Sequence, residues 1–298
     1  MPKKMLPLLL LLALLLGGCV RRETGPEPTP ELTPAPTFDP YASLVLVPDG
    51  TGKEVWVVNR RELPLNTLEP GDFVPDGNYI DYTGSDVCAM RGIDVSEHQQ
   101  DIDWEAVAAD GVEFAMIRVG FRGYNYGSFE EDKFFHQNMQ GAAAAGIKIG
   151  VYFFSQAISY EDAQAEARFV LEEIEPYRDS ITLPVCFDWE RITWQSARTD
   201  NVDAVTLSKC ALGFAETVRE AGYTPMVYFF RDMGYNVYDL SQLKDIDFWA
   251  GAAGTTPDFY YRHTIWQYSY TGRVAGISTD CDLDLYFIYP EDETPSAE

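Results

Sequence analysis

The chain has 298 residues, of which 46% are hydrophobic and 14% aromatic, so it can bury a large core and is neither a disordered acidic protein nor a small disulfide scaffold. Its 47 acidic residues outnumber 22 basic ones, for a net charge of −25 without a basic stripe, which argues against nucleic acid as a partner. Five cysteines without a C-x-x-C pair and three scattered histidines argue against a Cys- or His-based metal site.

The first 40 residues have the composition of an export signal followed by a spacer. Two lysines precede the apolar run Leu6–Leu16, which is too short to span a bilayer. The segment Leu16-Gly-Gly-Cys19 resembles a bacterial lipobox, in which the Cys thiol receives a diacylglycerol before cleavage. We therefore predict a lipoprotein signal peptide at 1–18, lipidation at Cys19, and an extracytoplasmic protein that is lipid-anchored to the bacterial cell membrane. An ordinary secretory signal with an incidental cysteine is the alternative.

Two further segments precede the main domain. Residues 19–40 contain six prolines, which favours an extended, lipid-anchored linker that lifts a domain off the membrane. Residues 41–87 are predicted to form a small β-rich extension, because the apolar runs Leu44–Val47 and Val55–Val58 flank the turn signal Pro48-Asp-Gly50, and a second turn signal follows at Pro75-Asp-Gly77. No chemistry is recognisable in the extension.

From residue 88 to residue 290 the pattern changes to alternating strands and helices. Apolar periodicity predicts helices at Trp104–Ala109, through Ala142–Ala145, at Glu161–Tyr177 and at Leu207–Ala221. Buried strands are predicted at Gly92–Val95, Phe114–Val119, Ile147–Phe154, Leu183–Glu190, Thr224–Phe230, Asp247–Ala252, Thr264–Tyr268 and Asp282–Phe287. This order implies an α/β, barrel-like domain with an irregular final third, followed by an acidic tail at 291–298.

Acidic side chains mark the ends of several predicted strands. Asp188 and Glu190 are two residues apart at the end of one strand, so they point to the same side, which in a closed barrel is the interior. Two carboxylates held close together repel each other, and one keeps its proton near neutral pH, as a glycosidase acid requires. Asp94 ends the first strand and Asp282 begins the last, and barrel closure would bring these two together with the first pair.

The residues around these acids bear on what the acids do. A cation site would also use carboxylate ligands, but no calcium-type loop is present, and we predict neither a metal nor a cofactor. Aromatic residues accompany the acids near the strand ends, and their faces would pack against sugar rings in a carbohydrate groove, although about half of them are expected to be core. These residues are Tyr152, Phe154, Tyr228, Phe230, Trp266, Tyr268 and the segment Phe121–Tyr126.

The sequence resembles glycoside hydrolase family 25 lysozymes from Gly92 to Phe287. The segment Arg91–Trp104, with Gly-Ile-Asp94-Val-Ser96 and Asp103-Trp104, is similar to the opening motif of that family. Further matches in the family's order are Phe114–Arg118, Asp132–Asn138, Ala144–Tyr152, Asp188-Trp-Glu190, Trp266-Gln-Tyr268 and Asp282-Leu-Asp284. The resemblance implies a flattened TIM-like (β/α)5(β)3 barrel and an N-acetylmuramidase that cleaves the β-1,4 bond between N-acetylmuramic acid and N-acetylglucosamine in peptidoglycan.

The resemblance also implies roles for individual residues. Glu190 matches the general acid, Asp188 the residue that orients the 2-acetamido group, and Asp94 a third catalytic carboxylate. Substrate binding is implied for Asp282, Tyr152, Tyr228, Trp266 and Gln267. The acetamido oxygen would be the nucleophile, with net retention, although a carboxylate nucleophile and an inverting water remain open. Phe153 stands where the family often has His, and Gln100 where Gly is frequent, so the grip on the sugar could differ.

Two other functions are compatible with parts of the sequence. A chitinase-like glycosidase matches only Asp188-Trp-Glu190, because Leu183 and Cys186 occupy positions where its motif has further acids. A catalytically weak peptidoglycan-binding lipoprotein is the other alternative, since a fold alone does not establish activity. We expect a monomer whose partners are peptidoglycan glycan strands and the membrane. Cys186 and Cys210 are expected to be buried thiols, and a bridge between Cys88 and Cys281 is disfavoured by strand polarity.

Overall fold

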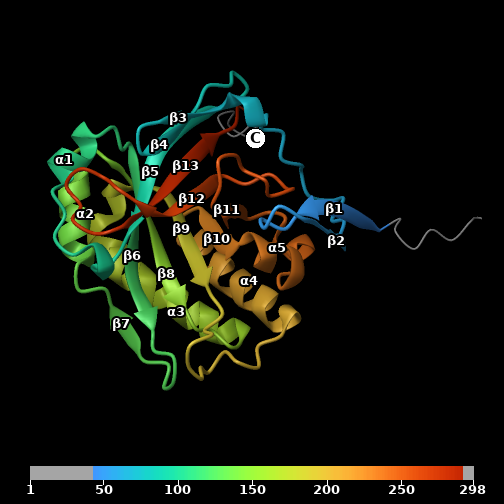
Figure 1. Cartoon of the computed structure of the whole chain (residues 1–298). Coiled ribbons are helices and arrows are strands. Elements are labelled where there is room, and N and C mark those ends of the chain that lie inside the picture. Colours follow the sequence, from blue (N-terminus) through green and yellow to red (C-terminus); the bar gives the residue numbers. More distant parts are fainter. Residues whose placement is uncertain (1–42, 291–298) are drawn as a thin grey trace, which may run out of the picture. The chain divides into compact units, whose positions relative to one another are not determined.

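The computed structural model describes residues 43–290 (Figure 1). The predicted signal peptide at 1–18, the linker at 19–40 with Cys19, and the acidic tail at 291–298 lie outside the described residues. Within 43–290, no helix combines the length and the apolar character that crossing a membrane would require.

Two antiparallel hairpins precede the barrel. Strand β1 (Leu44–Pro48) pairs with β2 (Glu54–Val58), and β3 (Phe73–Asp76) pairs with β4 (Tyr79–Tyr82), with the turns at the two Pro-Asp-Gly segments. Gly50 and Gly77 adopt positive φ there, which glycine does at little cost. The short 3-10 helix η1 (Pro70–Asp72) leads into β3. Phe73 lies edge-on against Trp266 at 5.4 Å, so this extension shares the core of the barrel domain.

A nine-stranded sheet forms the centre of the domain (Figure 1). Its order is β5-β13-β12-β11-β10-β9-β8-β6-β7, and an additional pairing of β5 with β6 closes the sheet into a barrel. Strand β13 runs antiparallel to β12 and β5, β7 runs antiparallel to β6, and the other pairs are parallel. The closed α/β barrel predicted from the sequence is confirmed, and each expected strand coincides with one observed strand. Their bounds are β5 (Cys88–Val95), β6 (Phe114–Arg122), β7 (Phe129–Glu131), β8 (Lys148–Ser155), β9 (Ile181–Trp189), β10 (Pro225–Phe230), β11 (Asp247–Gly251), β12 (Ile265–Gly272) and β13 (Cys281–Ile288).

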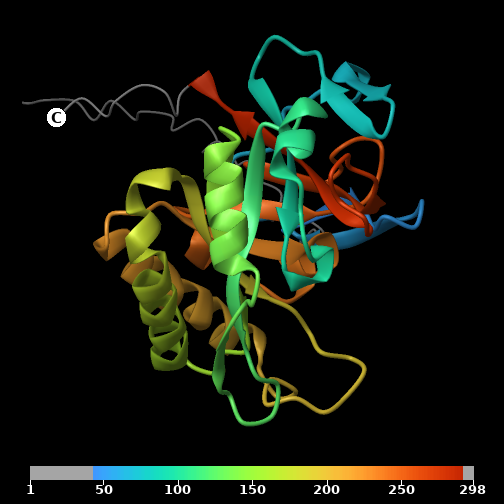
Figure 2. The ribbon, with the colours of Figure 1, turned by 90° about the vertical axis from the view of Figure 1, so that its left-hand side faces the viewer.

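Helices pack on the outside of the strands (Figure 2). Asp103, Ser159 and Asp203 cap three of them, each accepting a hydrogen bond from a backbone N–H in the first turn. The helix expected to reach Tyr177 ends at Ile174 and continues as a 3-10 turn, because Pro176 has no N–H to extend the α-helical pattern. The helices are α1 (Trp104–Ala109), α2 (Phe135–Ala144), α3 (Tyr160–Ile174), α4 (Ala204–Glu220) and α5 (Arg231–Asn236), with 3-10 helices η2 (Glu97–Gln99), η3 (Glu175–Ser180) and η4 (Leu240–Leu243).

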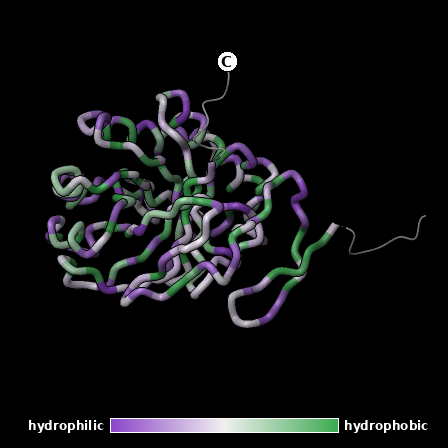
Figure 3. Tube along the Cα trace, turned by 90° about the horizontal axis from the view of Figure 1, so that it is seen from above, coloured by the Kyte–Doolittle hydropathy of each residue, from purple (hydrophilic) through white to green (hydrophobic). Residues whose placement is uncertain are grey.

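Alternation along the strands divides the core into two layers. Side chains such as Met116, Cys186 and Met226 fill the inside of the barrel, while their sequence neighbours pack outward against the helices. In the colouring of Figure 3, hydrophobic segments gather toward the centre of the domain and hydrophilic ones toward its loops. Cys186 and Cys210 are buried thiols as expected, and all four cysteines of the described residues are free. Cys88 pairs with Ile288 in the register of β5 and β13, so it lies at the opposite end of these strands from Cys281.

Candidate active site

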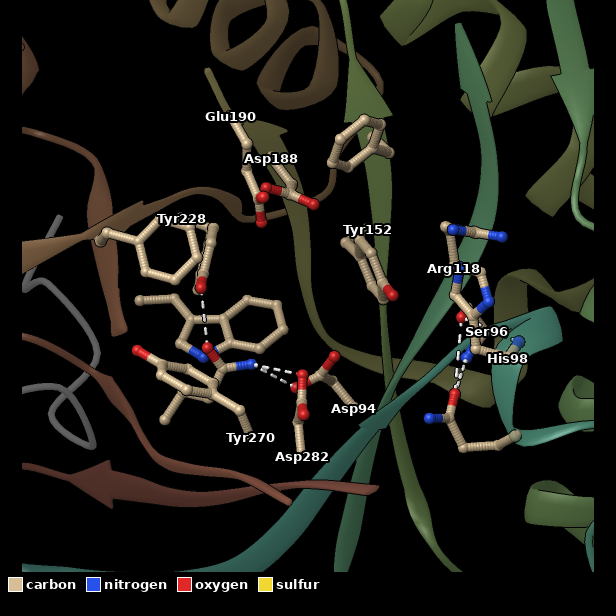
Figure 4. A pocket seen from close by; sticks show the side chains of 15 residues that line it. Asp94, Ser96, His98, Arg118, Tyr152, Asp188, Glu190, Tyr228, Tyr270 and Asp282 are labelled. Atoms are coloured by element: carbon tan, nitrogen blue, oxygen red, sulfur yellow. Dashed lines mark hydrogen bonds between the residues drawn. The ribbon is translucent and has the colours of Figure 1, made fainter. Parts of the chain in front are cut away.

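The four acids singled out in the sequence line one cavity of about 260 Å³ at the carboxyl end of the parallel strands (Figure 4). Asp188 is the penultimate residue of β9 and Glu190 follows that strand, so the two-residue spacing does place both side chains on the cavity side. Asp282 lies opposite Asp94 in the antiparallel register of β13 and β5. Barrel closure therefore brings together the acids of the first, fourth and last long strands.

One glutamine holds the Asp94–Asp282 pair. The Gln267 Nε2 donates to Asp94 Oδ2 at 2.7 Å and to Asp282 Oδ2 at 3.2 Å, while its Oε1 accepts a hydrogen bond of 2.7 Å from the Tyr228 hydroxyl. Burial and then Asp282 raise the pKa of Asp94 well above its ordinary value, and burial raises the pKa of Asp282 to about 6. This part of the cavity therefore retains a proton near neutral pH.

In the Asp188–Glu190 pair, Glu190 can donate a proton and Asp188 can accept a hydrogen bond. Burial, reinforced by Asp282, raises the pKa of Glu190 to about 7. Burial and the neighbouring Glu190 also raise the pKa of Asp188, whereas Arg118 opposes this rise. Among the described residues nothing donates a hydrogen bond to Asp188 Oδ1, although this atom is buried. A protonated Glu190 can act as a general acid near neutral pH, and Asp188 Oδ1 is free to accept a hydrogen bond from a bound ligand.

A fifth acid was not proposed from the sequence as a site residue. Asp284 is fully buried, and its Oδ1 accepts a hydrogen bond of 2.9 Å from Trp249 Nε1. Burial and Asp282 raise the pKa of Asp284 well above its ordinary value. Trp249 itself lines the cavity, so Asp284 acts on the site by fixing this indole. The Asp-x-Asp spacing at 282–284 carries the signal, because alternation points both side chains to one face.

The predicted aromatic residues divide between the cavity and the core. Tyr152 and Tyr228 line the cavity, as do Phe154 and Phe230 from the same strands. Trp266 does not, and its assignment to substrate binding is corrected: it is fully buried, packs on Phe73, and its Nε1 donates to the Ala252 carbonyl at 2.8 Å. The reason is alternation, since Gln267 faces the barrel interior and its neighbour must face outward.

The two departures from the family pattern have different structural consequences. Phe153 is fully buried on the outer side of β8, where it packs against Phe169, so the side chain at position 153 does not reach the cavity. Gln100 has φ of 57°, in the region that favours glycine, directly after η2. Gln100 is thus a strained backbone position, and it does not line the cavity that holds the acids.

A polar side of the cavity was missing from the predicted set of site residues. Ser96, His98, Gln99 and Arg118 line this side, and Tyr270 lines the cavity across from them, on the side of Tyr228 (Figure 4). Arg118 is held by Asp132, whose Oδ2 accepts from Arg118 Nε at 2.8 Å and from the backbone N–H of Glu97 at 2.8 Å. This buried ion pair ties β6 to the turn that carries Ser96 and His98.

One side-chain group within the described residues has a spacing that could hold a metal ion. Glu131 of β7, His136 of α2 and Glu173 of α3 each offer an atom within 4.8 Å of the others. None of these three residues lines the cavity with the acids.

A closed α/β barrel whose mouth holds buried carboxylates with raised pKa values among aromatic side chains is the arrangement expected of a glycoside hydrolase. A profile of the family described as "Glycosyl hydrolases family 25" matches residues 93–277, and the chain belongs to this family. Lysozyme M1 of Streptomyces globisporus is 29% identical over 280 residues, covering 91% of this chain and 89% of that protein. The autolytic lysozyme of Clostridium acetobutylicum is 30% identical over 198 residues, which are 66% of this chain and 56% of that protein.

Solved structures support the fold. The modular autolysin LytC of Streptococcus pneumoniae superimposes with a TM-score of 0.59 at 24% identity, over 82% of this chain and 57% of that one. A bacterial lysozyme of Streptomyces coelicolor superimposes with a TM-score of 0.51 at 25% identity, over 66% of this chain and 91% of that one. The match to the second structure spans nearly all of that protein.

Proposed function

We propose that this protein is a lysozyme that hydrolyses the β-1,4 bond between N-acetylmuramic acid and N-acetylglucosamine in peptidoglycan. The observation that carries the proposal is Glu190, a carboxyl group with its pKa raised to about 7, beside Asp188 in a cavity lined by tyrosines. The relatives at 29% and 30% identity are a lysozyme and an autolytic lysozyme, which supports peptidoglycan as the substrate. A neighbouring solved structure is a complex with a synthetic peptidoglycan ligand.

In the proposed reaction, Glu190 donates its proton to the glycosidic oxygen as the bond to the anomeric carbon breaks. Asp188 Oδ1 accepts a hydrogen bond from the N–H of the 2-acetamido group, and the acetamido oxygen bonds to the anomeric carbon as the leaving sugar departs, which forms a five-membered oxazolinium ring. The ionised Glu190 then removes a proton from a water molecule that attacks the anomeric carbon and breaks its bond to the acetamido oxygen. The two successive inversions retain the anomeric configuration. Asp94 and Asp282, fixed by Gln267, form the polar floor of the sugar site.

Product analysis and one variant test the proposal. Purified protein should release new reducing ends from peptidoglycan, and mass spectrometry should show N-acetylmuramic acid at those ends. Glu190→Gln should lose roughly 10²- to 10⁴-fold in turnover, because it removes the proton donor. Glu54→Gln, an exposed carboxylate on β2, is the matched control and should keep full activity. Products ending in N-acetylglucosamine, cleavage of chitin alone, or full activity in Glu190→Gln would each contradict the assignment.

Two finer features of the molecule belong to the same proposal. The element order, with β/α units from β5 to α5 followed by β11, β12 and β13, supports the (β/α)5(β)3 arrangement that we propose for the barrel. The composition of residues 1–40 supports an extracytoplasmic enzyme tethered to the membrane through a lipidated Cys19. Metabolic labelling with a fatty acid should mark the wild-type protein and not Cys19→Ala; label that persists in the variant would refute the anchor.

A further inference from the structure

Strand β7 and helices α2 and α3 bring together three side chains of the types that bind metal ions. Glu131 is the last residue of β7, His136 is the second residue of α2, and Glu173 lies in the last turn of α3. One atom from each side chain lies within 4.8 Å of the other two. Their spacing in the sequence matches no metal-binding motif, so only the packing of the three elements reveals the group.

The imidazole of His136 is held with one nitrogen toward the carboxylates. Its Nε2 lies 3.1 Å from Glu131 Oε1, while its Nδ1 lies 2.9 Å from the Tyr177 hydroxyl. With the lone pair on Nε2, the Nδ1–H donates to the Tyr177 oxygen, and such a bond on the second nitrogen is typical of histidines that bind metals. The Glu131 and His136 side chains keep 39% and 46% of their surface exposed, so a small ion can reach them from solvent.

The two carboxylates of the group lack a permanent positive partner. Within residues 43–290, neither Glu131 nor Glu173 forms a salt bridge with a lysine or an arginine. Burial, followed by the charge of Glu131, raises the pKa of Glu173. The carboxylates therefore repel each other, and a divalent cation between them would turn this repulsion into attraction. Exposed acids often gather without an ion, so the oriented imidazole beside them is the deciding feature.

The distances and the ligand types suit a transition metal. Three atoms no more than 4.8 Å apart share a centre at most about 2.8 Å from each, and Zn²⁺ takes imidazole nitrogen and carboxylate oxygen at roughly 2.0–2.2 Å. A shift of less than about 1 Å, which rotation of the two glutamate side chains supplies, covers the difference. Ca²⁺ and Mg²⁺ prefer oxygen ligands alone, whereas imidazole suits Zn²⁺. Three protein ligands leave the fourth tetrahedral position to water.

We propose that Glu131, His136 and Glu173 bind one Zn²⁺ ion, which fastens β7 to α2 and α3. Strand β7 has three residues, all exposed, and lies at the edge of the sheet beside β6. Phe129 of this strand stacks on Phe169 of α3, with ring centroids 5.2 Å apart. An ion held by all three elements fixes the other end of the strand, and its binding adds to the stability of the folded state. None of the three ligands lines the cavity with the acids, so this inference does not rest on the proposed function.

Calorimetric titration of Zn²⁺ into the full-length protein, first freed of metal with a chelator, tests the site. In the wild type, Zn²⁺ at about 100 times its Kd should raise Tm by roughly 5 °C. Glu173→Gln and His136→Ala should each weaken binding on the order of 10- to 100-fold and lose most of the rise in Tm. Glu172→Gln is the matched control, because it removes the same charge from the neighbouring exposed residue of α3 without removing a ligand, and it should bind as the wild type does.

Each outcome of the titration decides the question. A wild type that does not bind Zn²⁺ overturns the site. Equal binding by the wild type, Glu173→Gln and His136→Ala places the ion elsewhere, and equal weakening in Glu172→Gln shows that net charge alone attracts it; both results contradict the proposal. Ca²⁺ at millimolar concentration should not displace Zn²⁺, and displacement would refute imidazole as a ligand. The titration uses no peptidoglycan, so its result is separate from the success or failure of the proposed function.

Discussion

Replacing Glu190 with Gln should make the folded protein more stable at pH 8, although it removes the proposed proton donor. Burial, together with Asp282, raises the pKa of Glu190 from 4.5 to about 7 in the folded state. Stability therefore falls as the pH rises from about 4.5 to 7, because the unfolded chain ionises this group more readily. The difference corresponds to about 3 kcal/mol at pH 8. Gln has nearly the same shape and carries no charge, so the variant escapes this loss.

Urea unfolding of both proteins at pH 4 and pH 8 measures the effect. The gain of Glu190→Gln over the wild type should be larger at pH 8 by about 3 kcal/mol, because at pH 4 the carboxyl is mostly protonated in both states. Glu54→Gln on β2 is the control, and its exposed charge should contribute less than about 0.5 kcal/mol at either pH. A gain that is the same at both pH values, or no gain at pH 8, would refute burial as the cause of the raised pKa.

Three further outcomes follow from the same geometry. Activity should fall as the pH rises past about 7, where Glu190 loses its proton. Asp282→Asn removes a nearby negative charge and should shift this fall in kcat/KM to lower pH. An unchanged pH profile would contradict an effect of Asp282 on the pKa of Glu190. Gln100→Gly should raise Tm by roughly 2–4 °C in calorimetry, because φ of 57° favours glycine, and a lower Tm would show that the side chain outweighs the strain. Asp132→Ala should cost about 3–5 kcal/mol in urea unfolding, because buried Arg118 loses its partner, and a loss below about 1 kcal/mol would show that the guanidinium is adequately paired elsewhere.

Features that depend on local periodicity could be predicted from the sequence. Alternation was sufficient to place Asp188 and Glu190 in one cavity and to point Cys186 into the barrel. The same rule applies to β12: because Gln267 faces the cavity, its neighbour Trp266 must face away from it. The aromatic character of Trp266 favours a sugar contact, but its position in the alternation along β12 decides which side of the sheet it faces.

Features that depend on loops could not be predicted in this way. Arg118 faces the groove because Asp132, from the segment after β7, fixes its guanidinium, and nothing in the spacing of the two residues shows this contact. Trp194 stands in a connection without a repeating pattern, and tertiary contacts such as the bond from the Arg198 backbone N–H to the Tyr124 carbonyl hold it near Glu190. Such positions are set by tertiary contacts between segments whose sequences carry no periodic signal.

Because β13 is the last strand and pairs with β5, the barrel can close only after most of the chain has been synthesised. Gln267 is bonded to Asp94 across 173 residues of sequence, and the strand that carries Asp282 is the last of the barrel. A growing polypeptide therefore contains Asp94, Asp188 and Glu190 well before Gln267 and Asp282 have been synthesised. Any chain interrupted before Cys281 lacks the closing strand β13 and, with it, Asp282. The cavity with its four acids is thus complete only when the polypeptide has been made through β13.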